Sequence, residues 1–284
     1  MNGSVSKPQP LVWLRIGGAL LFALLYLYPI MGVVLCLQAL GCFLYAVIFD
    51  DDEEFGRAFR VHMTRQANGH GPVILWVLQT ILGFKVNFTF DRTNIGVAGQ
   101  PVIIVPNHLS IMDIPLADVA MYKIGRGAIR WVLKAPLKWV IPIGWAAQWI
   151  WCAFVLRGGA KTREVDLASV KSCGECAYND GQDVLIFSEG TRRGPSDGHG
   201  PKRGGFEALL NVMPLADVVT IVFRWSDEGG RPVGRGVFAA ALSLPGRTID
   251  VEIKRVPRAE IHADWLNEHF TAVRAAVSSS QPSR

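Results

Sequence analysis

The sequence predicts an α/β protein in which helices cover a largely parallel sheet, preceded by a hydrophobic, membrane-anchoring helical hairpin. The sheet is indicated by short apolar runs, such as residues 102–105 (VIIV), which alternate with segments of helical pattern along most of the chain. The hairpin is indicated by the 33 residues from Ile16 to Ile48, none of which is charged. A chain of 284 residues can form one large α/β domain with such additions, or two small domains.

The uncharged N-terminal run is too long for one straight spanning helix, which needs about 20 apolar residues, and too short for two. Pro29 and Gly32 lie near its middle, where a helix would kink or turn. We therefore expect residues 16–28 and 33–48 to form a hairpin that re-enters or lies tilted in the membrane, with a single span as the alternative. Basic residues on both sides of the run favour the cytoplasmic face for both ends, which in a bacterium is that of the inner membrane.

Four regions are expected along the chain. After the anchor comes a charged stretch with a second apolar segment, residues 72–83 (PVILWVLQTILG). This segment is too short to span a membrane, so it predicts an interfacial or core helix. The expected regions are an N-terminal membrane anchor (1–49), a charged linker with the interfacial helix (50–83), the α/β domain (84–258) and a C-terminal helix with a tail (259–284).

Each element of the α/β domain is predicted from its own pattern. Residues 84–90 (FKVNFTF) alternate like a half-buried strand, whereas the other strands are short apolar runs typical of buried strands. Residues 137–149, rich in Trp, favour helix or loop. The predicted strands are 84–90, 102–105, 129–133, 154–156, 183–187, 218–223 and 248–256, and the predicted helices are one that ends at about residue 123, 163–179 and 204–213.

The composition narrows the partners of the protein. Half of the residues are hydrophobic, the mean hydropathy is +0.26, and the net charge is +5 with a pI near 9.0. A basic, apolar chain suits an anionic membrane surface or phosphorylated substrates. The basic residues form no stripe with interleaved aromatic residues, so we expect no nucleic-acid partner. The five Cys form no disulfide framework, and the carboxylates and histidines lack the spacing of metal ligands, so we expect no metal.

A candidate general base with a nearby carboxylate lies in residues 107–113, NHLSIMD. His108 would follow the strand 102–105, and Asp113 would lie in the first turn of the next helix, which Pro115 supports. The carboxylate could then bind one imidazole nitrogen while the other nitrogen takes a proton from a hydroxyl group. In the alternative interpretation, Asp113 only stabilises the helix N-terminus, in part through a capping box with Ser110.

An anion-binding turn is predicted at residues 187–192, FSEGTR, where the strand 183–187 ends. Gly190 lets the backbone approach a ligand, and Thr191 and Arg192 can donate hydrogen bonds to phosphate oxygens. Glu189 is expected to orient Arg192 or an acceptor hydroxyl. Taken alone, the segment could be a surface turn with a charge pair. Two motifs that each follow a strand instead favour one site at the carboxyl edge of a parallel sheet.

The two motifs resemble the NH-x4-D and [FP]-x-EGTR motifs of the glycerophosphate and lysophospholipid O-acyltransferases, among them the 1-acyl-sn-glycerol-3-phosphate acyltransferases. The resemblance covers residues 84–256. It implies that Arg157, at the end of a block similar to G-x-[FI]-[FIV]-x-R, and Lys134, in a segment similar to K-x-x-L, contact the acceptor phosphate. Ser188 stands where the family usually has Pro, and residues 218–223 lack the family's V-P-[VI] block. These departures bear on the identity of the acceptor.

The resemblance also implies the reaction. His108 would remove the proton of the acceptor hydroxyl and Asp113 would orient the imidazole, with acyl-CoA or acyl-carrier protein as co-substrate and with no cofactor or metal. The acceptor would be a membrane lysophospholipid, most simply lysophosphatidate, which becomes phosphatidate. The alternatives are a phosphate-free lyso-lipid, such as an amino-lipid or glycolipid, and a non-enzymatic membrane scaffold. The implied substrate-binding residues are Lys134, Arg157, Glu189, Gly190, Thr191 and Arg192.

Overall fold

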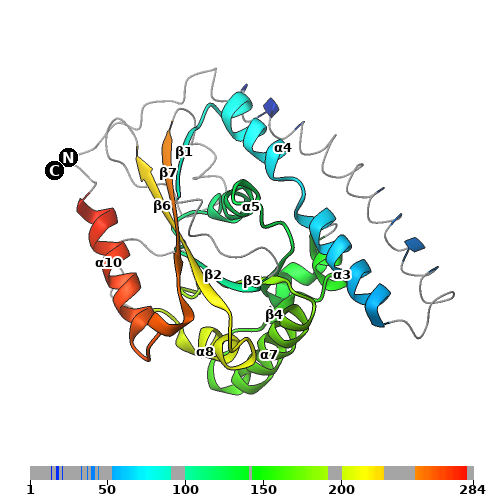
Figure 1. The fold of residues 1–284 in the computed structure, drawn as a ribbon. Helices are drawn as coiled ribbons and strands as arrows, with labels where there is room; N and C mark the ends of the chain where they lie inside the picture. The colour runs from blue at the N-terminus through cyan, green and yellow to red at the C-terminus, as the bar shows by residue number, and fades with distance from the viewer. Residues whose placement is uncertain are drawn as a thin grey trace.

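A seven-stranded sheet forms the centre of the computed structural model, which describes residues 53–90, 100–140, 143–190, 200–226 and 247–279 together with single positions between 14 and 44 (Figure 1). The strand order is β1-β7-β6-β2-β5-β3-β4. Every neighbouring pair is parallel except β6 and β7, so the predicted largely parallel sheet is confirmed. The strands are β1 (Lys85–Phe90), β2 (Val102–Pro106), β3 (Ile129–Lys134), β4 (Ala153–Val155), β5 (Asp183–Leu185), β6 (Asp217–Ser226) and β7 (Thr248–Val256).

The parallel part of the sheet brings distant segments to one edge. In the register, Ile104 of β2 lies opposite both Leu185 of β5 and Val219 of β6. The chains that leave β2, β5, β6, β3 and β4 therefore all emerge at the same carboxyl edge. The NHLSIMD segment, the residues after β5 and Arg157 after β4 all lie at this edge. This is the arrangement expected if the two motifs form one site at the carboxyl edge of a parallel sheet.

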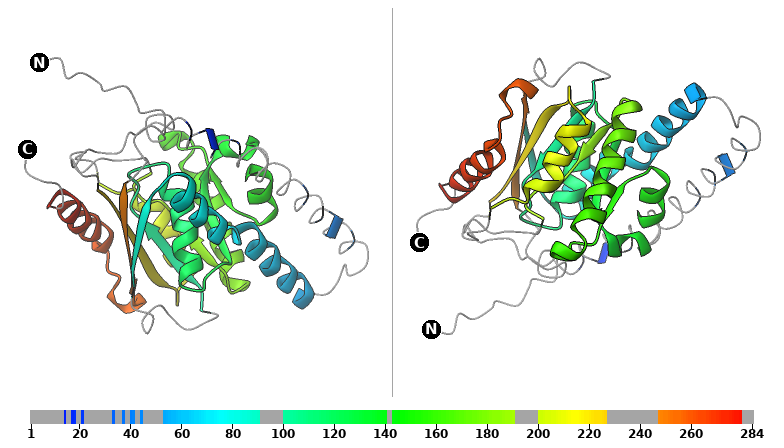
Figure 2. Two further views of the ribbon diagram at one scale, coloured as in Figure 1. Left: turned by 90° about the horizontal axis from the view of Figure 1, so that it is seen from above. Right: turned by 90° about the horizontal axis from the view of Figure 1, so that it is seen from below.

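Helices cover both faces of the sheet. One face is packed with the buried side chains of α5 and the segment before β1, such as Leu116 and Leu78, and the other with those of α7, α8 and α10, such as Val170, Leu209 and Phe270. Figure 2 shows α4 and α5 over the sheet from above, and α7 and α8 over it from below. The helices are α3 (Glu53–Asn68), α4 (Gly71–Trp76), α5 (Asp113–Lys123), α6 (Ile143–Trp149), α7 (Arg163–Asn179), α8 (Arg203–Val212) and α10 (Trp265–Ser279).

Short helical turns join these elements. Residues 135–139 between β3 and α6 form a 3-10 helix, whose last three residues begin the segment predicted as helix or loop. Helix α4 continues directly into a π-helical turn. The helix predicted at 72–83 is thus present, and it packs against α5, where Gly71 contacts Tyr122. The short helices are η2 (Val77–Ile81), η4 (Ala135–Trp139), η5 (Gly159–Lys161) and η6 (Arg258–Glu260).

The stretch expected as a charged linker contains a helix, α3, that packs on the α/β domain. Met63 of α3 lies in a small hydrophobic cluster with Ala147 and Ile150 at α6. Arg60 pairs with Asp180 at 2.7 Å, and the same carboxylate is bound by the buried Arg130 at 2.5 Å. These contacts make α3 part of the body of the domain.

Most of the expected N-terminal hairpin, including Pro29 and Gly32, lies outside the described residues. The described positions there are helical, and their apolar side chains are largely exposed. In the part of the chain that the structure describes, no helix is long and apolar enough to cross a membrane. The exposed apolar side chains at these positions are Leu14, Leu21, Val33, Leu37, Leu40 and Leu44.

Candidate active site

The end of β2 is fixed by the side chain of Asn107. Its amide nitrogen donates to the Phe223 carbonyl at 3.1 Å, and its amide oxygen accepts from the Phe223 N–H at 2.8 Å. The side chain thus takes the place of a further backbone pair between β2 and β6, one residue beyond Pro106. Because Asn107 is almost completely buried, this pairing sets the position from which His108 enters the site.

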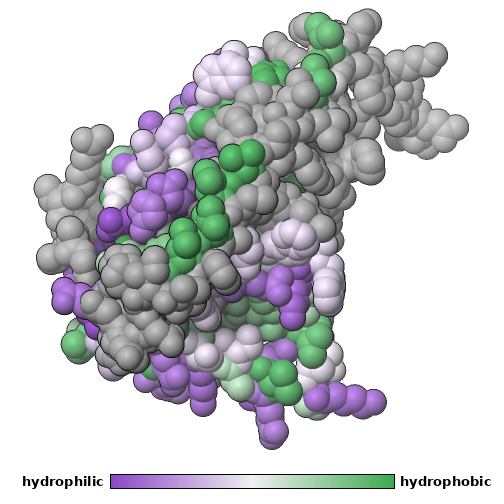
Figure 3. Space-filling model, turned by 90° about the vertical axis from the view of Figure 1, so that its right-hand side faces the viewer, coloured by the Kyte–Doolittle hydropathy of each residue, from purple (hydrophilic) through white to green (hydrophobic). Residues whose placement is uncertain are grey.

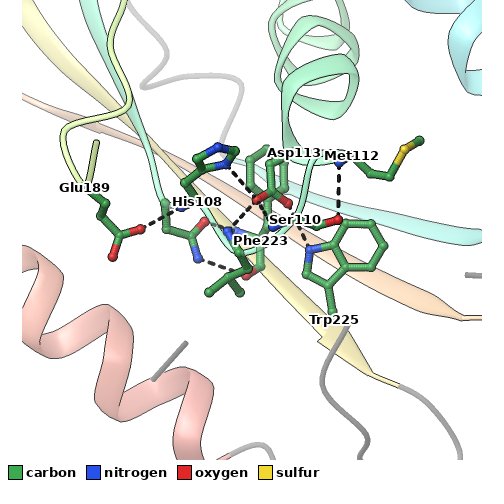
Figure 4. Close-up of polar contacts among 9 residues, drawn as sticks. His108, Ser110, Met112, Asp113, Glu189, Phe223 and Trp225 are labelled. Carbon is green, nitrogen blue, oxygen red and sulfur yellow. Dashed lines mark hydrogen bonds and ion pairs between the residues drawn. The ribbon is translucent and has the colours of Figure 1, made fainter. Parts of the chain in front are cut away.

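The His108 ring lies directly after this point, on the carboxyl edge of the sheet. Its side chain is 13% exposed, and its Nδ1 is 3.3 Å from Asp113 Oδ2 (Figure 4). The ring packs at an angle on Phe187, with 4.4 Å between the ring centroids. Within the described residues Nε2 has no hydrogen-bond partner, so this nitrogen is available for a proton-transfer step.

Asp113 begins α5, and its carboxylate is completely buried. Oδ2 accepts hydrogen bonds from the backbone N–H groups of Leu109 at 2.5 Å and Ser110 at 2.6 Å, as well as facing His108. Oδ1 accepts from the indole N–H of Trp225, on β6, at 3.0 Å (Figure 4). The structure therefore brings His108 and Asp113 together, with His108 at the strand exit and Asp113 in the first helical turn. The Ser110 N–H bond to Asp113 is also the contact expected if Asp113 stabilises the N-terminus of the helix.

Glu189 of the second motif forms a hydrogen bond with the backbone of the first motif. Its Oε2 accepts from the His108 backbone N–H at 2.7 Å, and its Oε1 lies 3.5 Å from the Arg274 guanidinium on α10. Burial raises the pKa of this carboxyl, against the lowering effects of the His108 N–H and of Arg274. The resemblance groups Glu189 with the substrate-binding residues. In the structure its carboxylate binds the Arg274 guanidinium and supports the backbone of His108.

Gly190 and Arg157 meet beside this pair. The Arg157 Nη1 group donates to the Gly190 carbonyl, and burial lowers the pKa of the guanidinium. Both residues have positive φ angles, +71° at Gly190 and 60° at Arg157. A positive φ is uncommon for a residue with a side chain, and the Asp166 carboxylate, which accepts from the Arg157 N–H at 2.9 Å, helps to hold it.

Of the other residues that the resemblance implies for substrate binding, the structure describes only Lys134. Lys134 ends β3 at the same carboxyl edge and is exposed. Lys202 lies against Gly190, where an added Cβ would come within 3.0 Å of its side chain, and its N–H donates to the Ser188 carbonyl at 2.7 Å. Thr191 and Arg192 lie outside the described residues.

Three residues that support the site are not predicted as such from the sequence. Asn107 is part of the first motif, and its sequence position at the end of a strand is the one signal of its role. Trp225 and Arg274 bind Asp113 and Glu189 from β6 and α10, far along the chain. No sequence pattern links these two residues to the motifs.

The site lies apart from the cavities and contains no metal-binding cluster within the described residues. One cavity of about 340 Å³ lies between α8 and the start of α10, where it is lined by Arg203 and His262, and another of about 460 Å³ is lined by Gln100 and Gly181. No group of three or more His, Cys, Asp or Glu side chains in the described residues could hold a metal ion. The chemistry that the residues at this edge support is proton transfer beside basic groups.

Comparison with known proteins agrees with this arrangement. Residues 87–224 match the model of the Acyltransferase family, a region that contains both motifs and Arg157. The fold is similar to that of the 1-acyl-sn-glycerophosphate (LPA) acyltransferase PlsC from Thermotoga maritima, with a TM-score of 0.58 and 17% identity over 96% of this chain and 98% of that one. No curated protein sequence matches this chain.

The family match and the geometry concern the same residues. The matched region begins in β1 and ends in β6, and it contains the His108–Asp113 pair at the carboxyl edge together with Glu189 and Gly190. Residues 87–224 therefore resemble the Acyltransferase family, and the protein is an acyltransferase enzyme.

Proposed function

We propose that this acyltransferase moves a fatty acyl group from a thioester to the hydroxyl group of a lysophospholipid, most simply converting lysophosphatidate to phosphatidate. The observation that carries the proposal is the His108 ring on the edge where Arg157 and Gly190 also lie. Asp113 holds its Nδ1, and among the described residues no group binds its Nε2. PlsC from Thermotoga maritima, which has a similar fold, is an acyltransferase for 1-acyl-sn-glycerophosphate, and this agrees with a phosphate-bearing acceptor.

In the proposed reaction His108 Nε2 takes the proton of the acceptor hydroxyl as its oxygen attacks the thioester carbonyl carbon. The new C–O bond gives a tetrahedral oxyanion. When the oxyanion collapses, the C–S bond breaks and the thiolate leaves with the proton from His108. Asp113 supports the cycle by holding Nδ1 and by facing the imidazolium that forms in between.

The acceptor phosphate would be held by basic groups around the turn after β5. Arg157 has one of its N–H groups on the Gly190 carbonyl, which leaves further donors of the planar guanidinium for phosphate oxygens. Arg192 and Thr191 of the same turn and Lys134 from β3 complete the proposed set. Glu189 lies beside this set and positions the backbone of His108 and the Arg274 guanidinium.

We also propose that the N-terminal part of the chain anchors the enzyme in a membrane. Residues 1–49 would anchor the protein, residues 50–83 would connect the anchor to the catalytic domain at 84–258, and residues 259–284 would form the C-terminal helix and tail. The exposed apolar side chains at the described N-terminal positions support this anchor. The active site would face the cytoplasm, at the inner membrane of a bacterium, where acyl-CoA or acyl-carrier protein is the donor.

A panel of acceptors tests the proposal. The purified full-length protein is given an acyl thioester and either lysophosphatidate, other lysophospholipids or phosphate-free lyso-lipids, and the products are identified by mass spectrometry. We expect diacyl products from phosphate-bearing acceptors, with lysophosphatidate the best. Acylation of phosphate-free acceptors alone would contradict the assignment of the basic residues and would favour an amino-lipid or glycolipid acceptor.

A further inference from the structure

The chain between β3 and β4 carries exposed tryptophans on two short helices, one of which packs on α3. We call residues 135–151, which contain η4 and α6, the flank segment. Ala147 and Ile150 face Met63 of α3 in a hydrophobic cluster. In contrast, Trp139 is 77%, Trp151 is 49% and Trp145 is 45% exposed. Large aromatic side chains usually contribute to cores or interfaces, so three of them exposed on one short segment indicate a surface that binds something.

In sequence, the chain on both sides of the flank segment carries charged residues of one sign. Between residues 119 and 163 the sequence has no Asp or Glu but has eight Lys and Arg residues. Two of these, Arg126 and Arg130, pair with acids at the start of β5 and in the turn before it. Lys138 is exposed, and its ammonium group lies 5.7 Å from the centroid of the Trp139 ring. Such a surface is complementary to an anionic partner.

The pairing of exposed Trp with Lys indicates which partner. Trp is enriched where a membrane meets water, because its ring is apolar and its N–H is polar, and Lys extends its charge toward lipid head groups. Basic residues next to such rings are attracted by the negative surface of an anionic leaflet. A protein partner with an acidic surface would match the charge and could also bind exposed Trp. It would not explain the exposed apolar side chains at the described N-terminal positions, which favour a bilayer.

The flank segment lies on the side of the molecule that also carries the N-terminal apolar positions. Gly41 lies against the Phe59 ring of α3, the helix on which α6 packs. Val33, Leu37, Leu40 and Leu44 follow the spacing of one helix face, and all are exposed. Figure 3 shows this side, with hydrophobic side chains in an oblique row across it. A bilayer that receives this row would therefore also meet the flank segment.

We propose that the flank segment is a second membrane-contact surface, through which Trp139 and Trp145 enter the head-group region of an anionic bilayer. It rests on the proposed function, because it assumes that the acceptor lies in that bilayer. The segment begins directly after Lys134, on the carboxyl edge that carries His108. Contact at this point turns that edge toward the lipid surface, so that a lysophospholipid reaches the site without leaving the membrane.

The contact itself is measured by fluorescence quenching. The full-length protein is bound to phosphatidylglycerol–phosphatidylcholine vesicles in which the acyl chains carry bromine, which quenches nearby tryptophans. We expect the quenched fraction to fall when Trp139→Phe and Trp145→Phe are combined. In the matched control Trp265→Phe, whose ring stacks on Phe206 and His269, the quenched fraction should not fall. An unchanged quenched fraction in the double variant overturns the proposal, as does protection of Trp139 and Trp145 by self-association in solution.

The consequence for catalysis is measured with two acceptors. In the double variant Trp139→Ser and Trp145→Ser, the rate with a vesicle-embedded lysophospholipid should fall roughly tenfold, and that with a short-chain, water-soluble lysophospholipid should not change. Leu215→Ser, at a 68% exposed position on the opposite edge of the sheet, should change neither rate. Equal loss with both acceptors would contradict the proposal. If the unmodified protein acylates neither acceptor, the proposed function fails, while the quenching result still decides the membrane contact.

Discussion

At the scale of single residues, one carboxylate joins the first motif to the fold. Asp113 accepts hydrogen bonds from two backbone N–H groups and from Trp225, and it faces His108. A buried carboxylate with this many donors is fixed in position, so it can hold the imidazole in one orientation. The start of α5 and the orientation of His108 therefore depend on the same group.

The indole of Trp225 is predicted to be a positioning group for catalysis. Trp225→Phe keeps an aromatic ring in the sheet but removes the donor to Asp113 Oδ1, so kcat should fall about 3–30-fold with little change in KM. Asp113→Asn removes the charge that faces the imidazolium, and kcat should fall about 10²–10⁴-fold. The pH profile of kcat should shift in Trp225→Phe. A Trp225→Phe enzyme with the unmodified kcat and pH profile would show that the indole only fills space.

Arg157 is predicted to bind the acceptor rather than the donor. Arg157→Ala should raise the KM for lysophosphatidate about 10–100-fold, because a hydrogen bond to a charged group contributes about 1.5–3 kcal/mol, and should leave the KM for the thioester nearly unchanged. Arg157→Lys should recover part of the loss. Lys171→Ala, an exposed change on α7, is the control. Equal changes in both KM values would assign Arg157 a structural role at the Gly190 turn.

At the scale of elements, the sequence predicted the sheet because buried strands form continuous apolar runs. All seven predicted strands are present, and β7 has the predicted bounds. Helix α3 was not predicted, because its five charged residues led to the stretch being interpreted as a charged linker. Part of its stability comes from an ion pair between Arg60 and Asp180, 120 residues apart.

Which residues come together at the site could also be predicted from the sequence, but the contacts that support them could not. His108, Asp113, Gly190 and Arg157 come together because parallel strands present their carboxyl ends at one edge, a rule that can be applied to sequence. The supporting contacts of Asn107 and Trp225 join residues 116 and 112 positions apart. These pairs depend on the register of β2 against β6 and on the length of β6, neither of which local patterns specify.

A buried acid on α5 predicts a pH dependence of stability. Burial raises the pKa of Asp118 to about 8, and its Oδ1 has no hydrogen-bond partner within the described residues. The unfolded chain releases this proton near its ordinary pKa of 3.8, whereas the folded protein keeps it to about 8. Between these values the folded state binds more protons, so this group lowers the stability as the pH rises.

The prediction is tested with Asp118→Asn. The substitution removes the charge, so it should raise the Tm at pH 8.5 by about 2–8 °C and have a much smaller effect near pH 4. The measurement is thermal unfolding in detergent solution across this pH range. Parallel curves of Tm against pH for the two proteins would contradict the assignment of the proton to Asp118.

At the scale of the whole molecule, the proposed anchor and the active site must share one side of the membrane. Basic residues flank the uncharged run on both sides, which predicts that residues 1–10 and the catalytic domain are both cytoplasmic. Lys7→Cys and Glu207→Cys, made in a background without the exposed native thiols, should react together with an impermeant reagent in vesicles of one orientation. Reaction of one position without the other would indicate a single span and would place the site away from cytoplasmic thioesters.

The central claim is that His108 is the general base for acylation of a lysophospholipid. The most direct measurement is the rate of phosphatidate formation from lysophosphatidate and an acyl thioester, followed by mass spectrometry with purified unmodified protein and His108→Ala. The account predicts a rate about 10²–10⁴-fold lower for His108→Ala, with unchanged circular dichroism and membrane binding. Phosphatidate formation by His108→Ala at the unmodified rate would contradict it.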